Sequence, residues 1–452
     1  MLPQLTTQIP GPRSRLLGEQ LGRYESRNIT FVSDEFPIFW DRAEGSNVWD
    51  VDGNCYLDLT SAFAVSSLGH RNPKIIKALS SQANKLLHGM GDVHPTELKV
   101  ELCKKISEIT FERWTGKVGK SILSSSGSES IESALKTAFL ATGKEGIICF
   151  EGCYHGTSIG TLAASGLPRF REPFSKQINQ HGYVVPYGSH GLPQLLDLVK
   201  SNNIGAIIVE PILGRGGKIV PDDNFLPALR TICDEHKIIL IADEIYTGFN
   251  RTGKLFASDH WNVVPDIICL GKALAGGFPL SICTAKSEIM DFWPESDGEA
   301  IHTSTFLGNP LGCAMALESI SIHSDPSISV KVNQKGLLFR TALDNISHNS
   351  KGKIRGLGLM LGIEILNESG NPNGELASAI IKDSLRSGII TLADGPAGHV
   401  LAIAPTFCIS VIVLIILPPV VRVSSIATTF SPEFKLPSIL LVNPCSLTDG
   451  LI

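Results

Sequence analysis

The chain has 452 residues, of which 43% are hydrophobic and 18% are charged, and its 39 lysines and arginines against 44 aspartates and glutamates give a net charge of −5. This composition excludes a largely disordered chain, which needs low hydrophobicity and high net charge, and it supplies no basic surface for binding nucleic acid. The length is typical of two to four domains, and the low charged fraction indicates a large buried surface such as a subunit interface.

A β-hairpin is predicted near the N-terminus, where an Asp-Gly-Asn turn at 52–54 separates two strand-like runs at 48–51 and 55–59. Residues 1–21 contain no apolar run of the kind that a secretory signal needs. We expect residues 1–68 to form an N-terminal segment that joins a smaller domain.

Between residues 69 and 325, short apolar runs alternate with helical stretches. This alternation is typical of an α/β fold in which helices flank a mostly parallel central sheet. We therefore predict one large domain at 69–325. The expected strands are 146–150, 206–209, 238–242, 266–270 and 280–284, and the expected helices include 129–142 and 224–236.

The pattern changes again after residue 325. The run 354–366 (IRGLGLMLGIEIL) reads as a glycine-interrupted strand, and 375–387 places apolar residues on one helical face, with Gly388 as a C-cap. These elements predict a smaller α+β domain at 326–410, built from both ends of the chain.

Residues 411–452 form an atypical tail. Its first part, 411–417, is continuously apolar and rich in β-branched residues, so we expect it to be extended or irregular and not an amphipathic helix. The apolar stretch 408–417 is far shorter than the ~20 residues that span a bilayer, so no membrane partner is expected. Residues 422–452, rich in serine, threonine and proline, are expected to pack poorly.

Ten cysteines are scattered along the chain without a C-x-x-C pair, so the sequence predicts no metal site. Several lie within apolar runs, as Cys149 and Cys269 do, and read as small buried hydrophobic residues. Unpaired cysteines fit a reducing compartment, and we expect the protein to be cytoplasmic.

A candidate phosphate site lies where the apolar run at 122–123 is followed by SSSGSE at 124–129. Ser126 and Glu129 form a capping-box pattern at the start of a helix. A strand, a turn of small residues and a helix N-terminus together direct free N–H groups and the positive end of the helix dipole toward an anion. An ordinary well-capped helix has the same pattern, so this motif alone leaves both interpretations open.

An acid and a lysine follow two other predicted strands. Asp243 comes directly after 238–242, at the carboxyl edge of the sheet, where open α/β sheets bind ligands. Lys272 follows 266–270, and a desolvated lysine has a lowered pKa and can form a Schiff base. Taken alone, Asp243 fits the role of a helix-capping residue equally well, and Lys272 fits that of an ordinary surface lysine. Together with an anion site, they are the three groups that pyridoxal phosphate needs for its ring nitrogen, aldehyde and phosphate.

Seven motifs extend this pattern along the chain: SGSESIESALKTA (126–138), FEGCYHG (150–156), VEPILGRGG (209–217), IADEIYTGFNRTG (241–253), LGKALAGGFPL (270–280), HTSTFLGNPLG (302–312) and GLGLMLGIEI (356–365). With them, the chain resembles the class III aminotransferases, which have fold type I among pyridoxal-phosphate enzymes. The resemblance runs from about residue 49 to 405. The phrase NVWDVDGNCYLDL at 47–59 is most similar to the 4-aminobutyrate and ω-amino acid aminotransferases.

The resemblance implies two catalytic residues and a phosphate cradle. Lys272 would hold the aldehyde of pyridoxal 5'-phosphate and then act as the general base and acid of amino transfer. Asp243 would keep the ring nitrogen protonated through a charge-assisted hydrogen bond. Gly127 and Ser128, next to Ser126, would cradle the phosphate.

The resemblance also places residues around the cofactor ring. Tyr154 would stack on one face, and Ile245 would press against the other. Glu210 would lie near the phenolic oxygen, and Tyr246 stands where many members have a glutamine near that oxygen. Thr305 corresponds to the threonine that this family supplies to the phosphate in the neighbouring subunit. A homodimer with shared active sites is therefore expected.

The chain departs from the family at three positions that concern substrate carboxylates. Several members bind a carboxylate with an arginine where this chain has Thr157, and others use an arginine where it has Ala402. A glutamate that gates the second arginine is replaced by Arg215. The usual arginine–glutamate switch is absent as a pair, and Arg215 reads either as a substitute carboxylate binder or as an exposed loop residue.

The resulting prediction is a transaminase that moves an amino group from an ω-amino acid or amine to a 2-oxo acid. An aminomutase, racemase or phospho-lyase on the same scaffold is the alternative, and a non-catalytic homologue that binds pyridoxal phosphate is a third. Other residues in the motifs are expected to have structural roles: His155 in packing and hydrogen bonding, Arg251 in shaping a loop, and Glu132 as a solvated acid at a helix start.

Overall fold

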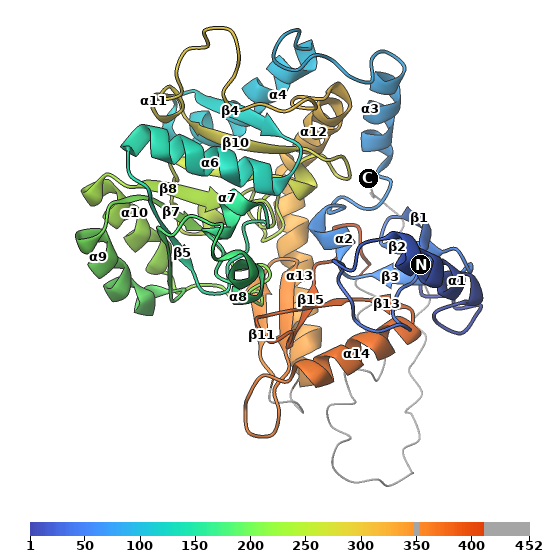
Figure 1. The fold of residues 1–452 in the computed structure, drawn as a ribbon. Helices are drawn as coiled ribbons and strands as arrows, with labels where there is room; N and C mark the ends of the chain where they lie inside the picture. The colour runs from blue at the N-terminus through green and yellow to red at the C-terminus, as the bar shows by residue number, and fades with distance from the viewer. Residues whose placement is uncertain (348–351, 411–452) are drawn as a thin grey trace.

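The computed structural model describes residues 1–347 and 352–410, and the predictions for 411–452 lie outside them (Figure 1). Its centre is a mixed sheet of seven strands, of which only β10 runs antiparallel to its neighbours. The predicted α/β class with a mostly parallel sheet is confirmed. In spatial order, the strands are β4 (Gly119–Ser124), β10 (Ser281–Lys286), β9 (Ile267–Leu270), β8 (Ile239–Asp243), β7 (Ile204–Val209), β5 (Gly146–Phe150) and β6 (Gly182–Val185).

The predicted strands are the apolar ones that lie inside this sheet. β7 is buried along its whole length, as expected of a parallel strand covered on both faces. The edge strand β6 was not predicted, because two of its four residues are only partly buried and its apolar run is short. The sequence pattern also did not predict the antiparallel direction of β10, because hydrophobic periodicity does not encode strand direction.

Helix α6 (Gly127–Thr142) packs across β4, β7, β8, β9 and β10 (Figure 1). The side chain of Ser126 caps its first turn by accepting from the N–H of Glu129 at 3.3 Å. The helix ends at Gly143, whose φ of +65° is the left-handed conformation that glycine adopts without a Cβ clash. On its inner face, Ile131 and Ala134 are fully buried. The cap therefore fixes the start of α6 at the edge of the sheet.

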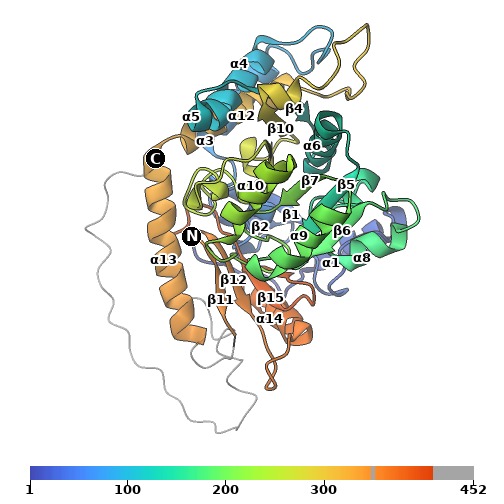
Figure 2. The ribbon, with the colours of Figure 1, turned by 90° about the vertical axis from the view of Figure 1, so that its left-hand side faces the viewer.

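Among the remaining helices, α14 packs against β13, β14 and β15 of the two smaller sheets. Figure 2 shows α13 as a long helix beside the sheet that contains β11 and β12. Among the described residues, no helix combines the length and apolar character needed to cross a membrane. The helices are α1 (Pro12–Tyr24), α2 (Ser61–Ala64), α3 (Pro73–Ala83), α4 (Glu97–Ser107), α5 (Arg113–Thr115), α7 (Ile159–Leu162), α8 (Pro168–Arg171), α9 (Leu192–Ser201), α10 (Phe225–His236), α11 (Ser287–Met290), α12 (Pro310–His323), α13 (Pro326–Ser347) and α14 (Gly374–Arg386).

Of the two four-stranded sheets, one combines strands from both ends of the chain, and the other is built from the C-terminal part alone. The predicted hairpin is present as β2 and β3, and β13 from the C-terminal part pairs in parallel with β3. The run 354–366, expected as one interrupted strand, is instead the antiparallel pair β11 and β12, which turns at Gly358 with a φ of +56°. The strands are β1 (Trp40–Glu44), β2 (Asn47–Asp50), β3 (Cys55–Asp58) and β13 (Ile389–Ile390) in one sheet, and β11 (Ile354–Leu357), β12 (Met360–Glu364), β15 (Val400–Ile403) and β14 (Leu392–Asp394) in the other.

Arg251 lies where these parts of the chain meet, and it does more than shape a loop. Its side chain is fully buried, and its guanidinium donates to the backbone oxygens of Leu359 at 3.1 Å and Pro405 at 2.6 Å. It also contacts the hydroxyl of Ser61 at 3.4 Å. Burial lowers the pKa of Arg251 to about 10, which still leaves it charged at neutral pH. Arg251 is thus a buried cross-link between distant segments.

We expect Arg251→Met to destabilise the fold by about 2–4 kcal/mol, because buried carbonyl oxygens lose their donors while the aliphatic volume is kept. Denaturant unfolding of the purified protein measures this loss. The control is Arg386→Met, a half-exposed arginine on α14 in an i,i+3 ion pair, which should change stability by less than about 0.5 kcal/mol. Equal effects of the two variants would contradict the role given to Arg251.

Candidate active site

The candidate site lies at one edge of the seven-stranded sheet. β4, β5, β7, β8 and β9 run in the same direction, so their carboxyl ends meet at this edge. A cavity of about 940 Å³ opens there between the sheet, the N-terminal segment and the C-terminal sheet. Its lining includes most of the predicted site residues, namely Gly127, Ser128, Tyr154, Glu210, Asp243, Ile245, Tyr246 and Lys272.

Asp243, the last residue of β8, is held in place from two sides. Its Oδ2 lies 2.7 Å from Nδ1 of His155, and its Oδ1 accepts from the N–H of Ile245 at 3.0 Å. An ionised carboxylate only accepts hydrogen bonds, so His155 donates from Nδ1. Both side chains are almost completely buried. These two contacts fix the orientation of the carboxylate, and the predicted hydrogen-bonding role of His155 is directed at Asp243.

Lys272 follows β9, the strand next to β8, and its backbone has a φ of +47°. This left-handed conformation is uncommon for a residue with a side chain, and such strain gathers at functional sites. Burial lowers the pKa of the Lys272 ammonium, although the carboxylates of Asp243 and Glu210 oppose this effect. A lysine with a lowered pKa has a larger fraction of the neutral amine, which is the nucleophilic form.

The N-terminus of α6, where the phosphate cradle is predicted, opens onto the cavity, and its capping pattern differs from the expected one. The carboxylate of Glu129 accepts from the N–H of Ser125 at 2.7 Å rather than from that of Ser126, so the box is shifted by one residue. The Ser128 hydroxyl is engaged with the hydroxyl of Ser158 at 2.8 Å. Any contribution of Ser128 to the cradle therefore comes from its backbone. A Cβ on Gly127 would lie 3.0 Å from Ile245, so glycine permits this close approach.

Glu210 follows β7 and anchors two loops of the cavity. Its carboxylate accepts from the N–H of Tyr154 and from the N–H of Gly214, both at 2.8 Å. Burial raises the pKa of Glu210 to about 7, although the two amides and His155 favour its ionised form. The ring of Tyr154 is packed edge-on against Phe170 at a centroid distance of 5.4 Å. Glu210 thus fixes the backbone that carries Tyr154.

Sequence reasoning missed two charged residues beside Tyr246. The side chain of Lys218 is completely buried, with Nζ 2.6 Å from Oδ2 of Asp394 and 3.1 Å from the Tyr246 hydroxyl. The ring of Tyr246 lies between two lysines, with Nζ of Lys218 at 4.3 Å and Nζ of Lys272 at 4.9 Å from its centroid. The sequence signal that could have identified Lys218 is a lysine within the glycine-rich, apolar stretch 213–220. No feature of the sequence indicates that this lysine pairs with Asp394.

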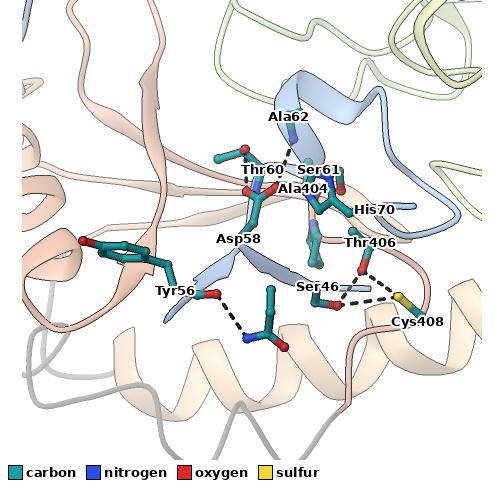
Figure 3. Close-up of polar contacts among 12 residues, drawn as sticks. Ser46, Tyr56, Asp58, Thr60, Ser61, Ala62, His70, Ala404, Thr406 and Cys408 are labelled. Atoms are coloured by element: carbon teal, nitrogen blue, oxygen red, sulfur yellow. Dashed lines mark hydrogen bonds and ion pairs between the residues drawn. The ribbon is translucent and has the colours of Figure 1, made fainter. Parts of the chain in front are cut away.

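A second missed feature is the wall formed by α2, in which all four residues have positive φ, from +48° to +65°. The turn is held by the fully buried Asp58, which accepts from the N–H of Thr60 at 2.7 Å and from that of Ala62 at 3.1 Å (Figure 3). His70 lies 2.8 Å from the same carboxylate. This left-handed turn directs Thr60 and the exposed Phe63 to the cavity.

Two predicted site residues lie outside the cavity, and one predicted structural role is wrong. Ser126 caps α6 but does not line the cavity, and Thr305 is exposed on a loop outside it. The expectation of a solvated Glu132 is wrong, because its carboxylate accepts from the Ser158 hydroxyl at 2.5 Å and from the N–H of Gly160 at 3.2 Å. Glu132 therefore fastens the start of α7 to α6.

The donor set suits pyridoxal 5'-phosphate. The backbone at Gly127 and Ser128 can receive an anion, Asp243 offers a fixed carboxylate to a protonated ring nitrogen, and Lys272 offers an amine to an aldehyde. Gly127 leaves room between the helix start and Ile245 that a larger residue would fill. Among the described residues, no group of acids, histidines and cysteines is arranged to hold a metal ion.

The chain is similar to known proteins over most of its length. The family model described as aminotransferase class-III matches residues 30–412. The 4-aminobutyrate aminotransferase GabT of Escherichia coli is 36% identical over 393 residues, covering 82% of this chain and 89% of that protein. The acetylornithine aminotransferase of Methanopyrus kandleri is 36% identical over 331 residues, covering 73% of this chain and 81% of that protein.

A solved structure is similar over most of the chain. The ornithine aminotransferase of Toxoplasma gondii aligns with a TM-score of 0.79 and 27% identity, covering 91% of this chain and 94% of that one. That crystal structure has pyridoxal phosphate at partial occupancy in its active site. These likenesses concern the fold and the kind of reaction, and the named donor differs from one relative to the next.

Proposed function

Because this chain belongs to the class-III aminotransferase family, whose members use pyridoxal 5'-phosphate, we propose that it moves an amino group from an ω-amino acid or amine to a 2-oxo acid. The observation that carries the proposal is the meeting of Asp243, Lys272 and the start of α6 in one cavity. The similarity to a 4-aminobutyrate aminotransferase supports the ω-amino donor.

The residues of the chain divide the work of the reaction. Bound pyridoxal phosphate supplies an electron sink for negative charge that develops on the substrate carbon. Asp243 holds a proton at the ring nitrogen, and His155 keeps that carboxylate correctly oriented. Nζ of Lys272 takes the proton from the substrate carbon as a general base and later returns it as a general acid. The backbone amides of Gly127 and Ser128 bind the phosphate.

We assign the ring contacts in the same way. Tyr154 and Ile245 line the cavity and are proposed to enclose the ring from opposite faces. The Tyr246 hydroxyl, fixed by Lys218 at 3.1 Å, and Glu210 are proposed to lie near the phenolic oxygen. A pre-organised shell of this kind holds the reacting atoms in place and excludes water.

Acceptor dependence tests the reaction type. Purified protein is incubated with an ω-amino acid or an amine, with and without 2-oxoglutarate or pyruvate. A transaminase consumes the donor beyond one equivalent of enzyme only when the 2-oxo acid is present. Sustained conversion of the donor without any acceptor would instead support an aminomutase, racemase or lyase. Bound cofactor without any conversion of the donor would support a non-catalytic homologue that binds pyridoxal phosphate.

We also propose a homodimer in which Thr305 completes the cofactor site of the neighbouring subunit. Its exposure outside the cavity of its own chain supports this arrangement. We expect Thr305→Ala to weaken pyridoxal phosphate binding by about 10- to 100-fold, the effect of losing one hydrogen bond to a charged group. Equilibrium dialysis measures this change.

Thr303→Ala is the matched control, because Thr303 lies on the same loop and donates to Asp92 of its own chain. It should leave cofactor affinity unchanged. Light scattering that finds a fully active monomer would contradict the shared site, as would equal cofactor affinity in the Thr305 and Thr303 variants.

Two broader proposals accompany this function. The division into a large domain at 69–325 and a smaller one at 326–410 that includes 1–68 is supported by a hydrophobic cluster in which Leu57 and Leu59 pack with residues of α13, α14 and β12. A reducing, cytoplasmic location is supported by the nine free cysteines of the described residues, most of them buried.

A further inference from the structure

Arg215 is a charged residue that faces the active-site cavity without a charged partner. It lies on the loop after β7, is only partly buried, and lines the cavity. Its guanidinium carbon is 5.3 Å from the ring centroid of Tyr154 and 5.5 Å from that of Phe170. Its backbone oxygen accepts from the N–H of Gly395 at 2.8 Å. Two aromatic rings therefore hold the side chain of Arg215, and the hydrogen bond from Gly395 holds its backbone.

The acids that line the same cavity are already engaged. Asp394 is paired with Lys218 at 2.6 Å, and Asp243 with His155 at 2.7 Å. Glu210 accepts from two backbone N–H groups. Within residues 1–347 and 352–410, no carboxylate lies within ion-pair distance of Arg215. The positive charge of the Arg215 guanidinium is therefore available to a ligand.

Among the described residues, no other cation near the cavity is placed to bind a substrate carboxylate. Thr157 and Ala402, which line the cavity where relatives have arginines, carry no charge. Lys218 is neutralised by Asp394, and Lys272 belongs to the reacting centre. Arg169 lines the cavity as an exposed residue and stacks on its neighbour Phe170 at 5.6 Å. An exposed arginine is well solvated, so it contributes long-range attraction but little fixed binding.

We propose that Arg215 binds the carboxylate of the amino donor, so that the preferred donor is an ω-amino carboxylate and not a simple amine; this inference rests on the proposed function. A guanidinium offers two parallel N–H donors that match the oxygens of a carboxylate, and stacking on Tyr154 and Phe170 limits its motion. The amine at the other end of the donor then reaches Lys272.

A pair of donors that differ only in the carboxylate tests the proposal. With 5-aminopentanoate, Arg215→Gln should raise KM about 10- to 100-fold, because one charge-assisted contact is lost. With pentan-1-amine, kcat/KM should change less than about threefold, because no contact is removed. Arg215→Lys keeps the positive charge but lacks the two parallel N–H donors of the guanidinium. Its KM for 5-aminopentanoate should therefore lie between those of wild type and Arg215→Gln. Arg169→Gln is the control and should affect both donors only weakly.

Binding of pentanoate, which has the carboxylate but no amine, gives a readout that does not depend on turnover. Calorimetry with the holoenzyme should show that Arg215→Gln weakens pentanoate at least tenfold, whereas Arg169→Gln does not. Unchanged pentanoate binding, or equal losses for the two donors, would overturn the role of Arg215. Wild-type protein that binds pentanoate through Arg215 but transfers no amino group would overturn the proposed function alone.

Discussion

We expect Lys272→Ala to abolish amino transfer and to leave pyridoxal phosphate bound only non-covalently. Lys218, the other lysine near the Tyr246 ring, is not expected to take its place, because it is buried in a pair with Asp394. Loss of the general base and acid alone costs about 10²–10⁴-fold, and loss of the nucleophilic amine adds to it. Steady-state rates and mass spectrometry after borohydride reduction measure the two effects.

Lys254→Ala provides the control, since Lys254 is an exposed lysine that does not line the cavity. This variant should keep both the activity and the borohydride-fixed cofactor. If the Lys272→Ala protein still holds cofactor covalently after reduction, another residue anchors the cofactor and the assignment is wrong.

Asp243→Asn is expected to bind the cofactor yet lose about 10²–10⁴-fold in rate. The amide has nearly the shape of the carboxylate but no charge, so it does not hold the proton at the ring nitrogen, and the electron sink weakens. His155, 2.7 Å from Asp243, would then lack its anionic acceptor. Single-turnover rates at saturating donor separate this loss from weaker substrate binding.

The conservative variant Asp243→Glu keeps the charge and should retain more activity than Asp243→Asn. A loss of less than about tenfold in Asp243→Asn, equivalent to about 1.4 kcal/mol, is too small for the role assigned to this carboxylate. Intact cofactor binding in both variants excludes a general collapse of the site.

The meeting of Asp243 and Lys272 could be predicted from the sequence. Each follows a short apolar run, and consecutive parallel strands bring their carboxyl ends to one edge, as β8 and β9 do. The start of α6 was predicted for a similar reason, because Ser126 marks the cap locally. Local pattern and parallel topology therefore account for the reacting centre.

The walls of the cavity depend on contacts between distant residues, which no local pattern encodes. Lys218 and Asp394 are 176 positions apart, and each singly reads as a solvated charge. The left-handed turn of α2 forms because Asp58 accepts from its backbone, although Ser61–Ala64 contains no glycine to indicate a positive φ. Arg251 and Glu132 were misjudged for the same reason.

The movement of labelled nitrogen tests the account most directly. Purified holoenzyme is given 5-aminopentanoate labelled with heavy nitrogen, together with unlabelled 2-oxoglutarate, and the products are analysed by mass spectrometry. We predict that the label appears in the α-amino group of glutamate, with one aldehyde acid formed per glutamate, and that Lys272→Ala forms neither. Label that stays in a rearranged donor, or that is released as ammonia, would contradict amino transfer.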